Sequence, residues 1–491
     1  MAGLAWRAWL CSAVGCTAAC SGDDGGGGGT GLVGTAGAPT TDGGDGDGDG
    51  DGTTASSQAD SDSTSAGDAS ATVGPTSDDG ASSGETGMTD DGPGVGECGN
   101  GVVEGDEGCD MPNGVDADGC NEDCTVSGAV LWSHSQAGAL GSNEDLNGIA
   151  VDAEGNAYVC GAFHNNALGS DYWIRQYTAV GGLGWTVSVD GPSGTTDNAR
   201  DIALRGDAVA VAGSVNSSGN DWRVMEYLQT GASGWSAGYN GPTSGSDIAE
   251  SVAADLTGNV FAVGRHAVDL QGNDVHVRQY LPGGGLGWTA SYTGAAGGDD
   301  RGLAVATDFE GNVIVAGYES VSAQGRNMWL RKYSPAGAVL WTVGFAGAAA
   351  LDDRANGVAT DAVGNIYVAG VEGTVAEGTI AWLRAYDPRG VEVWTETWAG
   401  TATLGATAVD VAVDSVGDVT IVGTENTAGA LIGMVRKYDP TGGVRWSETY
   451  ASVGPHLLNA VAVGPDDSLW VAGGVDLGID GRDAWVARLG Q

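Results

Sequence analysis

The sequence predicts an all-β fold, a seven-bladed β-propeller, on three observations. A Trp recurs at positions 132, 185, 235, 288, 341, 394 and 446, at intervals of 50 to 53 residues. This period fits one four-stranded propeller blade. Each unit also contains four short segments that alternate polar and apolar residues, with tight turns between them. The units lack the spacing of three and four between apolar residues that helical repeats show, which excludes that class of repeat protein.

The four expected strands are clearest in the fifth unit, at 356–361 (NGVATD), 365–370 (NIYVAG), 381–386 (AWLRAY) and 391–397 (VEVWTET). A Gly-Asn turn joins the first two strands, as in AVGN at 362–365. A turn with Pro and Gly joins the last two, as in DPRG at 387–390. Gly supplies the positive φ that a short hairpin requires, so both links are expected to be tight.

The ends of the repeat region predict how the ring closes. The region begins with a Trp strand, AVLWSHS at 129–135, and ends on a third-strand segment, DAWVARL at 483–489. By analogy with related propellers, each unit starts on its innermost strand and the Trp strand lies outermost. We therefore expect residues 129–135 to complete the last blade, which leaves no open sheet edge between the two ends.

Residues 129–491 resemble the bacterial beta-propeller repeat of the SBBP type. The resemblance rests on GIAVDAEGNAYVCG at 148–161, on GVATDAVGNIYVAG at 357–370, on an apolar third strand and on a G-x-x-x-W ending. It implies the fold and almost nothing about a ligand. Units two and seven depart from the pattern at 205–213 and 464–473, so their turns are expected to differ.

The N-terminus predicts export. Residues 8–19 form a short apolar run after Arg7, too short for a membrane-spanning helix and typical of a signal peptide. Residues 1–20 resemble a lipoprotein signal because TAAC precedes SGDDGGGGG, and Cys20 is the expected lipidation site. Cys16 and ordinary signal cleavage are the alternatives. We therefore expect an exported lipoprotein of the outer membrane or cell surface, attached to the membrane only by its lipid.

Residues 21–97 predict a disordered acidic linker. The segment consists almost wholly of Gly, Asp, Ser, Thr and Ala, and it includes DGGDGDGDGDG at 42–52. Such a composition cannot bury a core. As a Gly-rich coil it would reach about 50 Å, which suits a tether. A calcium-binding role for the acidic tract is disfavoured, because a flexible chain must lose much entropy to wrap an ion.

Residues 98–128 predict a small disulfide module. Four cysteines lie in this exported, core-poor stretch, and two disulfides are favoured over zinc because no C-x-x-C pair is present. Three pairings of these cysteines are open. The segment resembles the myxobacterial cysteine-rich repeat, from which it departs at MPNGV. The four residues are Cys98, Cys109, Cys120 and Cys124.

The candidate binding surface is the propeller face that carries long connections, expected to span roughly nine residues after the second strand and a similar length after the Trp strand. An acidic residue recurs there just before the innermost strand, and the series is broken by Ala406 and His456. An acidic ring could hold a hard cation such as calcium, or a basic ligand. The favoured alternative is that each carboxylate accepts backbone N–H groups of its own loop. The five candidates are Glu144, Asp197, Asp247, Asp300 and Asp353.

Charge and motifs narrow the function. The chain has 64 acidic and 19 basic side chains, a formal net charge of -45, so nucleic acid is excluded as a partner. We find no metal-ligand spacing among the five His, no nucleophile motif and no phosphate loop. The sequence therefore predicts a monomeric, non-enzymatic binding or scaffold protein without a required cofactor, with a polysaccharide or a protein as ligand. The alternative is a glycosidase or lyase that uses paired acidic residues.

Overall fold

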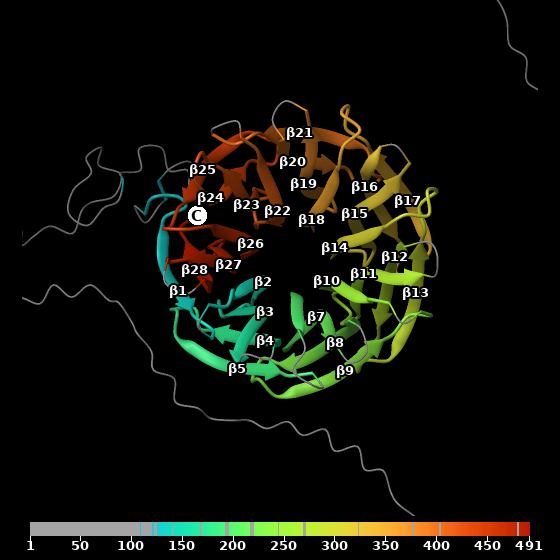
Figure 1. Ribbon diagram of the computed structural model, residues 1–491, viewed down its shortest axis with the longest axis horizontal. Helices are drawn as coiled ribbons and strands as arrows, with labels where there is room; N and C mark the ends of the chain where they lie inside the picture. The colour runs from blue at the N-terminus through green and yellow to red at the C-terminus, as the bar shows by residue number, and fades with distance from the viewer. Residues whose placement is uncertain are drawn as a thin grey trace, which may run out of the picture. The chain divides into compact units, whose positions relative to one another are not determined.

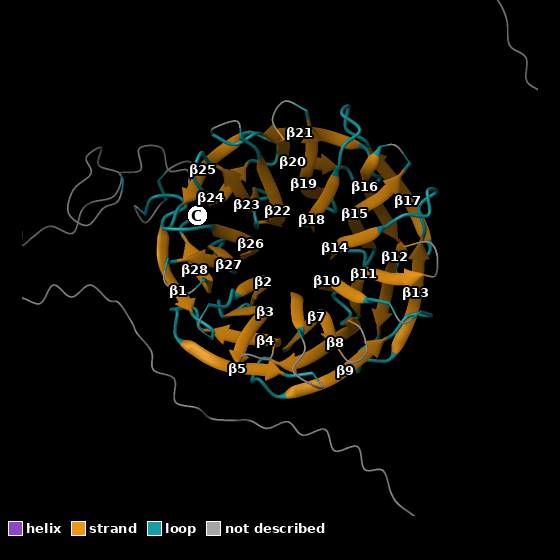
Figure 2. Ribbon diagram, viewed as in Figure 1, coloured by secondary structure: helices purple, strands orange, loops and turns teal. Residues whose placement is uncertain are grey.

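The computed structural model describes residue 109, residues 120–121 and 125–139, and residues 141–491 apart from short loop gaps at 167–168, 192–195, 217–219, 244, 269–271, 323, 376–377, 402–403 and 479–480. The described residues form seven antiparallel four-stranded sheets around a central axis (Figure 1). All of the regular structure in this part of the chain is β, with loops and turns between the strands (Figure 2). None of it forms a helix long and apolar enough to cross a membrane.

Each blade uses four consecutive strands, except the seventh. The innermost strands are β2 (Asp145–Val151), β6 (Asn198–Arg205), β10 (Ile248–Ala254), β14 (Arg301–Thr307), β18 (Arg354–Thr360), β22 (Ala406–Val413) and β26 (His456–Val463). The second strands are β3 (Ala157–Asn166), β7 (Ala208–Asn216), β11 (Val260–Val268), β15 (Val313–Val321), β19 (Ile366–Thr374), β23 (Val419–Asn426) and β27 (Leu469–Asp476).

The third strands are β4 (Gly169–Tyr177), β8 (Asn220–Leu228), β12 (Gly272–Tyr280), β16 (Gly325–Tyr333), β20 (Gly378–Tyr386), β24 (Leu431–Tyr438) and β28 (Arg482–Leu489). The outermost strands carry the recurrent Trp: β1 (Val130–Gln136), β5 (Leu183–Val189), β9 (Ser233–Tyr239), β13 (Leu286–Tyr292), β17 (Val339–Phe345), β21 (Glu392–Trp398) and β25 (Val444–Tyr450).

The seventh blade is closed by the first strand, as the sequence predicts. Its strand order is β1-β28-β27-β26, and β1 runs antiparallel to β28 with Trp132 opposite Arg488 and Gln136 opposite Ala484. Backbone bonds continue the pairing beyond the strands, from the Gly128 N–H to the Gly490 carbonyl at 3.2 Å. The two ends of the propeller therefore share one sheet, and β28 has no free edge.

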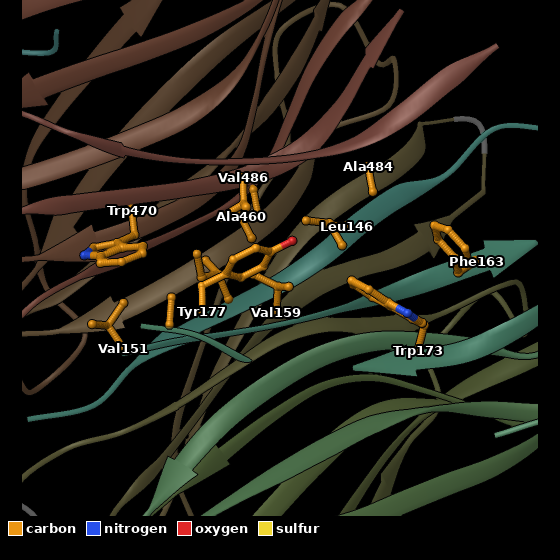
Figure 3. Packing of buried hydrophobic residues seen from close by; sticks show 13 residues of the cluster. Leu146, Val151, Val159, Phe163, Trp173, Tyr177, Ala460, Trp470, Ala484 and Val486 are labelled. Carbon is orange, nitrogen blue, oxygen red and sulfur yellow. The ribbon is translucent and has the colours of Figure 1, made fainter. Parts of the chain in front are cut away.

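Hydrophobic clusters between neighbouring blades hold the ring together. Seven clusters of buried apolar side chains are present in the described region, and each draws residues from two adjacent sheets. Figure 3 shows the one between blades one and seven, where Tyr177 and Val159 of the first blade face Ala460 and Trp470 of the last. The alternation seen in the sequence thus buries both faces of each inner strand against a neighbouring blade.

A Trp–Gly contact repeats at every blade boundary. The indole of each outer-strand Trp lies against the Gly that precedes the next outer-strand Trp by four residues, so that Trp341 covers Gly390 and Trp446 covers Gly128. All seven of these glycines adopt positive φ, from 76° at Gly128 to 92° at Gly442. A Cβ at Gly390 would lie 2.9 Å from Trp341 Cδ2, which is too close for any other residue. The Trp side chains thus serve packing between blades, the role that the sequence favours over a sugar platform.

The connections after the second strands are shorter than the sequence predicts. Nine or more residues were expected to be loop, but the second and third strands continue as a ladder, with Tyr318 opposite Met328 and Val321 opposite Gly325. β15 then ends at Val321, and β16 begins at Gly325. The expectation was wrong because the apolar alternation stops after the V-x-G segment, whereas the backbone pairing continues beyond it. The connections after the Trp strands keep the predicted length, as at 293–300 between β13 and β14.

One disulfide lies before the propeller, between Cys109 and Cys120, whose Cα atoms are 5.7 Å apart. It selects one pairing that the sequence left open and is consistent with a disulfide module. Cys20, Cys98 and Cys124 lie outside the described residues, as do the signal region 1–20 and the linker 21–97. Lipidation and the remaining pairing stay predictions.

Candidate functional site

The five acidic residues predicted from the sequence are buried, one in each of five blades. Each is at most 1 % exposed. Asp300 illustrates the arrangement: one carboxylate oxygen accepts the Gly294 N–H from the loop after β13, and the other accepts the Ser320 N–H of β15 at 2.7 Å. The carboxylate therefore ties the loop that enters a blade to the second strand of that blade.

The other four acids make related bonds. Three of them accept two backbone N–H groups each: Asp197 from Gly191 and Asn216, Asp247 from Gly241 and Ala267, and Asp353 from Gly347 and Gly373. Glu144 accepts the Gly138 N–H and forms a hydrogen bond with the His164 ring. Burial raises the pKa of Asp197, Asp300 and Asp353, and the bound backbone N–H groups oppose that rise.

Blades six and seven replace the acid in different ways. In blade six Ala406 occupies the position, and Glu425, opposite it on β23, supplies the carboxylate that accepts the Thr401 N–H at 3.0 Å. In blade seven both ring nitrogens of His456 are buried without a hydrogen-bond partner among the described residues. Burial lowers the pKa of His456 to about 4, so its ring is neutral at physiological pH. The retained carboxylate in blade six matches a role in organising the loop.

The structure does not gather these acids into one cluster. Across the described part of the chain, no group of three or more His, Cys, Asp or Glu is placed to hold a metal ion. Each carboxylate is enclosed by its own loop, and its hydrogen bonds account for its burial without a ligand. Ligand binding by the five acids stays a prediction from the sequence.

The central channel offers a different site, formed where a β-bulge interrupts every innermost strand. In β18, for example, the pairing with β19 skips from Ala355 to Gly357, so Asn356 is the bulged residue. A bulge redirects a side chain out of the regular ladder. The seven bulged residues, here called the channel ring, all line one cavity of about 390 Å³, together with Arg354, Val371 and Thr407. They are Asn147, Arg200, Glu250, Leu303, Asn356, Val409 and Asn459.

The channel ring varies more from blade to blade than the turn acid and the recurrent Trp do. The acid at the first turn recurs at five positions, and its carboxylate binds the N–H groups two and four residues later, as Asp308 binds those of Glu310 and Asn312. The channel ring instead contains Asn three times and Arg, Glu, Leu and Val once each. Every blade imposes the same packing, so positions fixed by packing should repeat. The variable ring gives the symmetric scaffold an asymmetric lining, which selective binding of a small ligand requires.

Arginines of the innermost and second strands gather around this cavity. Glu250 accepts a bond from Arg265 at 2.8 Å and lies 3.8 Å from Arg200. Arg301 pairs with Asp299 at 2.8 Å. Burial lowers the pKa of Arg265, Glu250 opposes that change, and the charges of Arg301 and Arg200 lower the pKa further. These arginines are therefore close enough to repel one another, although the whole chain is strongly acidic.

Two aspartates follow the bulge in blades two and six. Asp201 accepts the Ser251 hydroxyl at 2.6 Å and the Val252 N–H at 2.9 Å, both from blade three. Asp410 accepts the Val461 N–H of blade seven at 2.9 Å. Burial raises the pKa of Asp201 to about 6. It raises that of Asp410 to about 7, with a contribution from the charge of Asp201. Both carboxyl groups thus join adjacent blades and titrate near neutral pH.

Replacement of Asp410 by Asn should change how stability depends on pH. The folded-state pKa of about 7 lies above the ordinary value of 3.8, so the folded protein holds the proton more tightly than the unfolded chain. Ionisation of Asp410 therefore destabilises the fold, with no effect below about pH 4 and the full effect above about pH 7. Relative to wild type, Asp410→Asn should gain about 1–3 kcal/mol between pH 4.5 and pH 8. The full shift is not expected, because Asp410 is only half-buried and solvent screens its charge in part. Chemical denaturation at the two pH values measures this, and an equal stability difference at both would contradict it.

Comparisons with known proteins add the likeness of fold only. No protein-family model matches the chain, and no curated protein matches it. Similar solved structures include the polysaccharide lyase Uly1, with 12 % identity and a TM-score of 0.43 over 70 % of this chain and 89 % of that one. Sqt1 from Chaetomium thermophilum has 11 % identity and a TM-score of 0.39, over 73 % of this chain and 100 % of that one. A europium-containing methanol dehydrogenase has 12 % identity and a TM-score of 0.42, over 74 % of this chain and 93 % of that one. Identities and scores this low carry no argument about function.

Sequence reasoning missed the channel ring. The signal was present, because the ring residue stands five positions before the turn acid in each of five units, as in NGIAVD at 147–152 and LAVATD at 303–308. It is a variable position beside a constant apolar strand. The recurring acids give a stronger pattern, but recurrence in a repeat protein favours shared structural roles over ligand contacts.

Proposed function

We propose that this chain is an exported binding protein whose propeller holds a small ligand in the channel cavity without transforming it. The observation that carries the proposal is the channel ring, in which all seven blades contribute to one cavity with side chains that differ between blades. A purely structural spacer has no need of an asymmetric lining. The cavity volume of about 390 Å³ falls in the range of small-molecule sites.

The region before the propeller supports a surface location within this proposal. The lipoprotein-like signal with Cys20, the acidic linker and the disulfide module would present the propeller away from an outer membrane. The resemblance to SBBP repeats and to the myxobacterial cysteine-rich repeat agrees with an exported protein.

An acid–base enzyme is disfavoured by the bonds of Asp201 and Asp410, the two aspartates that follow the bulge. Their pKa values near neutrality would suit proton transfer. However, Asp201 accepts three hydrogen bonds, two of them from blade three, and Asp410 accepts backbone N–H groups of Val411 and Val461. These bonds fix both carboxyl groups between blades. Incubation with acidic polysaccharides should accordingly yield no shortened or unsaturated products.

A channel-filling variant tests the proposal. The mature chain is screened by thermal unfolding with glucose, galactose, glucuronate, galacturonate and their short oligomers. A ligand that binds the folded protein must raise the melting temperature. Val409→Trp, in the channel ring, should abolish the shift caused by any of these sugars. The control Val416→Trp changes a side chain that is 71 % exposed in the turn between β22 and β23, and it should leave the shift intact. A shift that survives Val409→Trp, or no shift with any sugar, would overturn the proposal.

A further inference from the structure

The arginines of the cavity lack enough carboxylates. Glu250 is paired with Arg265, and Asp299 with Arg301. Arg354 lines the cavity, and its Nε is buried without a hydrogen-bond partner among the described residues. The Nε of Arg200 is likewise buried without a hydrogen-bond partner among the described residues. A guanidinium stays protonated at physiological pH, so its buried N–H groups require hydrogen-bond acceptors.

The asparagines of the channel ring offer hydrogen-bond acceptors, whereas the arginines offer donors. Each donates its amide N–H to a backbone carbonyl of the next blade: Asn147 to Ala199, Asn356 to Ala408 and Asn459 to Leu146, at 2.8 or 2.9 Å. In the hydrogen bonds that these side chains make with other described residues, the amide nitrogen donates and the amide oxygen takes no part, and all three residues line the cavity. An amide oxygen accepts hydrogen bonds, so these three positions suit hydroxyl donors.

Apolar side chains complete the cavity. Leu303 and Val409 belong to the channel ring, and Val371 lies opposite Arg354 on the neighbouring strand. They can contact the C–H groups of a ligand. The ligand therefore needs an apolar surface for these side chains and polar groups for the arginines and asparagines. A small molecule with several hydroxyls, exposed C–H groups and one negative charge satisfies all three parts of the lining.

We propose that the channel cavity binds a carboxylated sugar, with the carboxylate paired to Arg354 and the hydroxyls donated to the asparagines of the channel ring. This inference rests on the proposed function and names its ligand class. Arg354 is the expected partner because it has no ion pair among the described residues, whereas Arg200 lies within 3.8 Å of Glu250. Arginine and a carboxylate form two parallel hydrogen bonds when the geometry allows, which distinguishes a carboxylate from a neutral hydroxyl.

Calorimetric titration of the full mature chain tests the ligand class. The probes are galacturonate, galactose and inorganic phosphate, each also offered to Arg354→Gln, to Arg354→Lys and to the control Arg326→Gln. Arg326 pairs with the exposed Asp352 and does not line the cavity. Galacturonate should bind wild type at least tenfold more tightly than galactose or phosphate. Arg354→Gln should weaken galacturonate binding about 10- to 100-fold and leave galactose unchanged. Arg354→Lys should recover part of the loss, and Arg326→Gln should match wild type.

The outcomes separate this inference from the proposed function. Equal binding of galactose and galacturonate would overturn the carboxylate requirement and leave the channel as a sugar site. Equal binding of phosphate would show that the arginines attract any anion, which would overturn the assignment to a sugar. If Arg354→Gln binds galacturonate like wild type while Val409→Trp does not, the carboxylate partner is wrong but the cavity stands. Failure of every probe in wild type would overturn the inference and count against the proposed function. The melting temperature of each variant, measured without ligand, shows whether it is folded.

Discussion

Removal of residues 1–136 should open the propeller and lower its melting temperature by more than about 10 °C. The deletion takes away β1, and blade seven then ends on β28 with an unpaired edge. It also removes Trp132, whose ring lies 5.0 Å from that of Trp470 and covers Gly181 of blade one. Loss of a fully buried Trp costs about 3–5 kcal/mol. Trp132 is partly buried, so its loss should cost less than that, and the lost strand pairing adds to it.

Removal of residues 1–124 is the matched control, because it takes away Cys109 and Cys120 together and leaves β1 and the Gly128 contact with Trp446 in place. This shorter protein should melt within a few degrees of the full chain and elute as a monomer. The longer deletion should form oligomers or aggregates through the exposed edge of β28. Thermal unfolding and gel filtration of the two proteins measure both effects. Similar melting temperatures and sizes would show that β1 does not close the ring.

Replacement of Gly390 by Val should lower the free energy of unfolding by about 3–5 kcal/mol. Gly390 ends the turn between β20 and β21 with a φ of 82°, a conformation that a β-branched residue resists. The new side chain would also collide with the ring of Trp341, which donates its indole N–H to the Pro388 carbonyl at 3.2 Å. Both effects act at the boundary between blades four and five. Denaturant titration measures the change.

Gly429 provides the control for this substitution. No atom lies within 4 Å of a Cβ built there, and its φ is not positive. Gly429→Val should therefore change the midpoint of unfolding only slightly. If Gly390→Val and Gly429→Val proved equally mild, the Trp–Gly contact would not be a determinant of blade packing.

Most of the fold could be predicted because its determinants recur in the sequence. The spacing of Trp132 from Gly128 matches that of Trp394 from Gly390, and the structure shows why: the Gly admits the Trp of the preceding blade. Blade closure followed from the order of the segments alone. The strand extensions could not be predicted in this way, since Glu319 to Val321 pair with β16 through the backbone and have no apolar pattern.

The site was less predictable, for a physical reason. The acid at the innermost strand recurs in five blades because each of those carboxylates anchors the same loop, as Asp300 anchors Gly294 and Ser320. No residue type recurs throughout the channel ring, because a ligand contacts each blade with a different atom. Arg354 and Asn356 are recognisable only once the bulges place them in one cavity.

The most direct test of a ligand in the channel is a crystal structure of the chain grown with digalacturonate. We expect electron density between the residues of the channel ring, with a carboxylate on Arg354 and hydroxyls on the amide oxygens of Asn147, Asn356 or Asn459. Density on the outer-strand Trp side chains or among the loops of the five buried acids, with an empty channel, would contradict it.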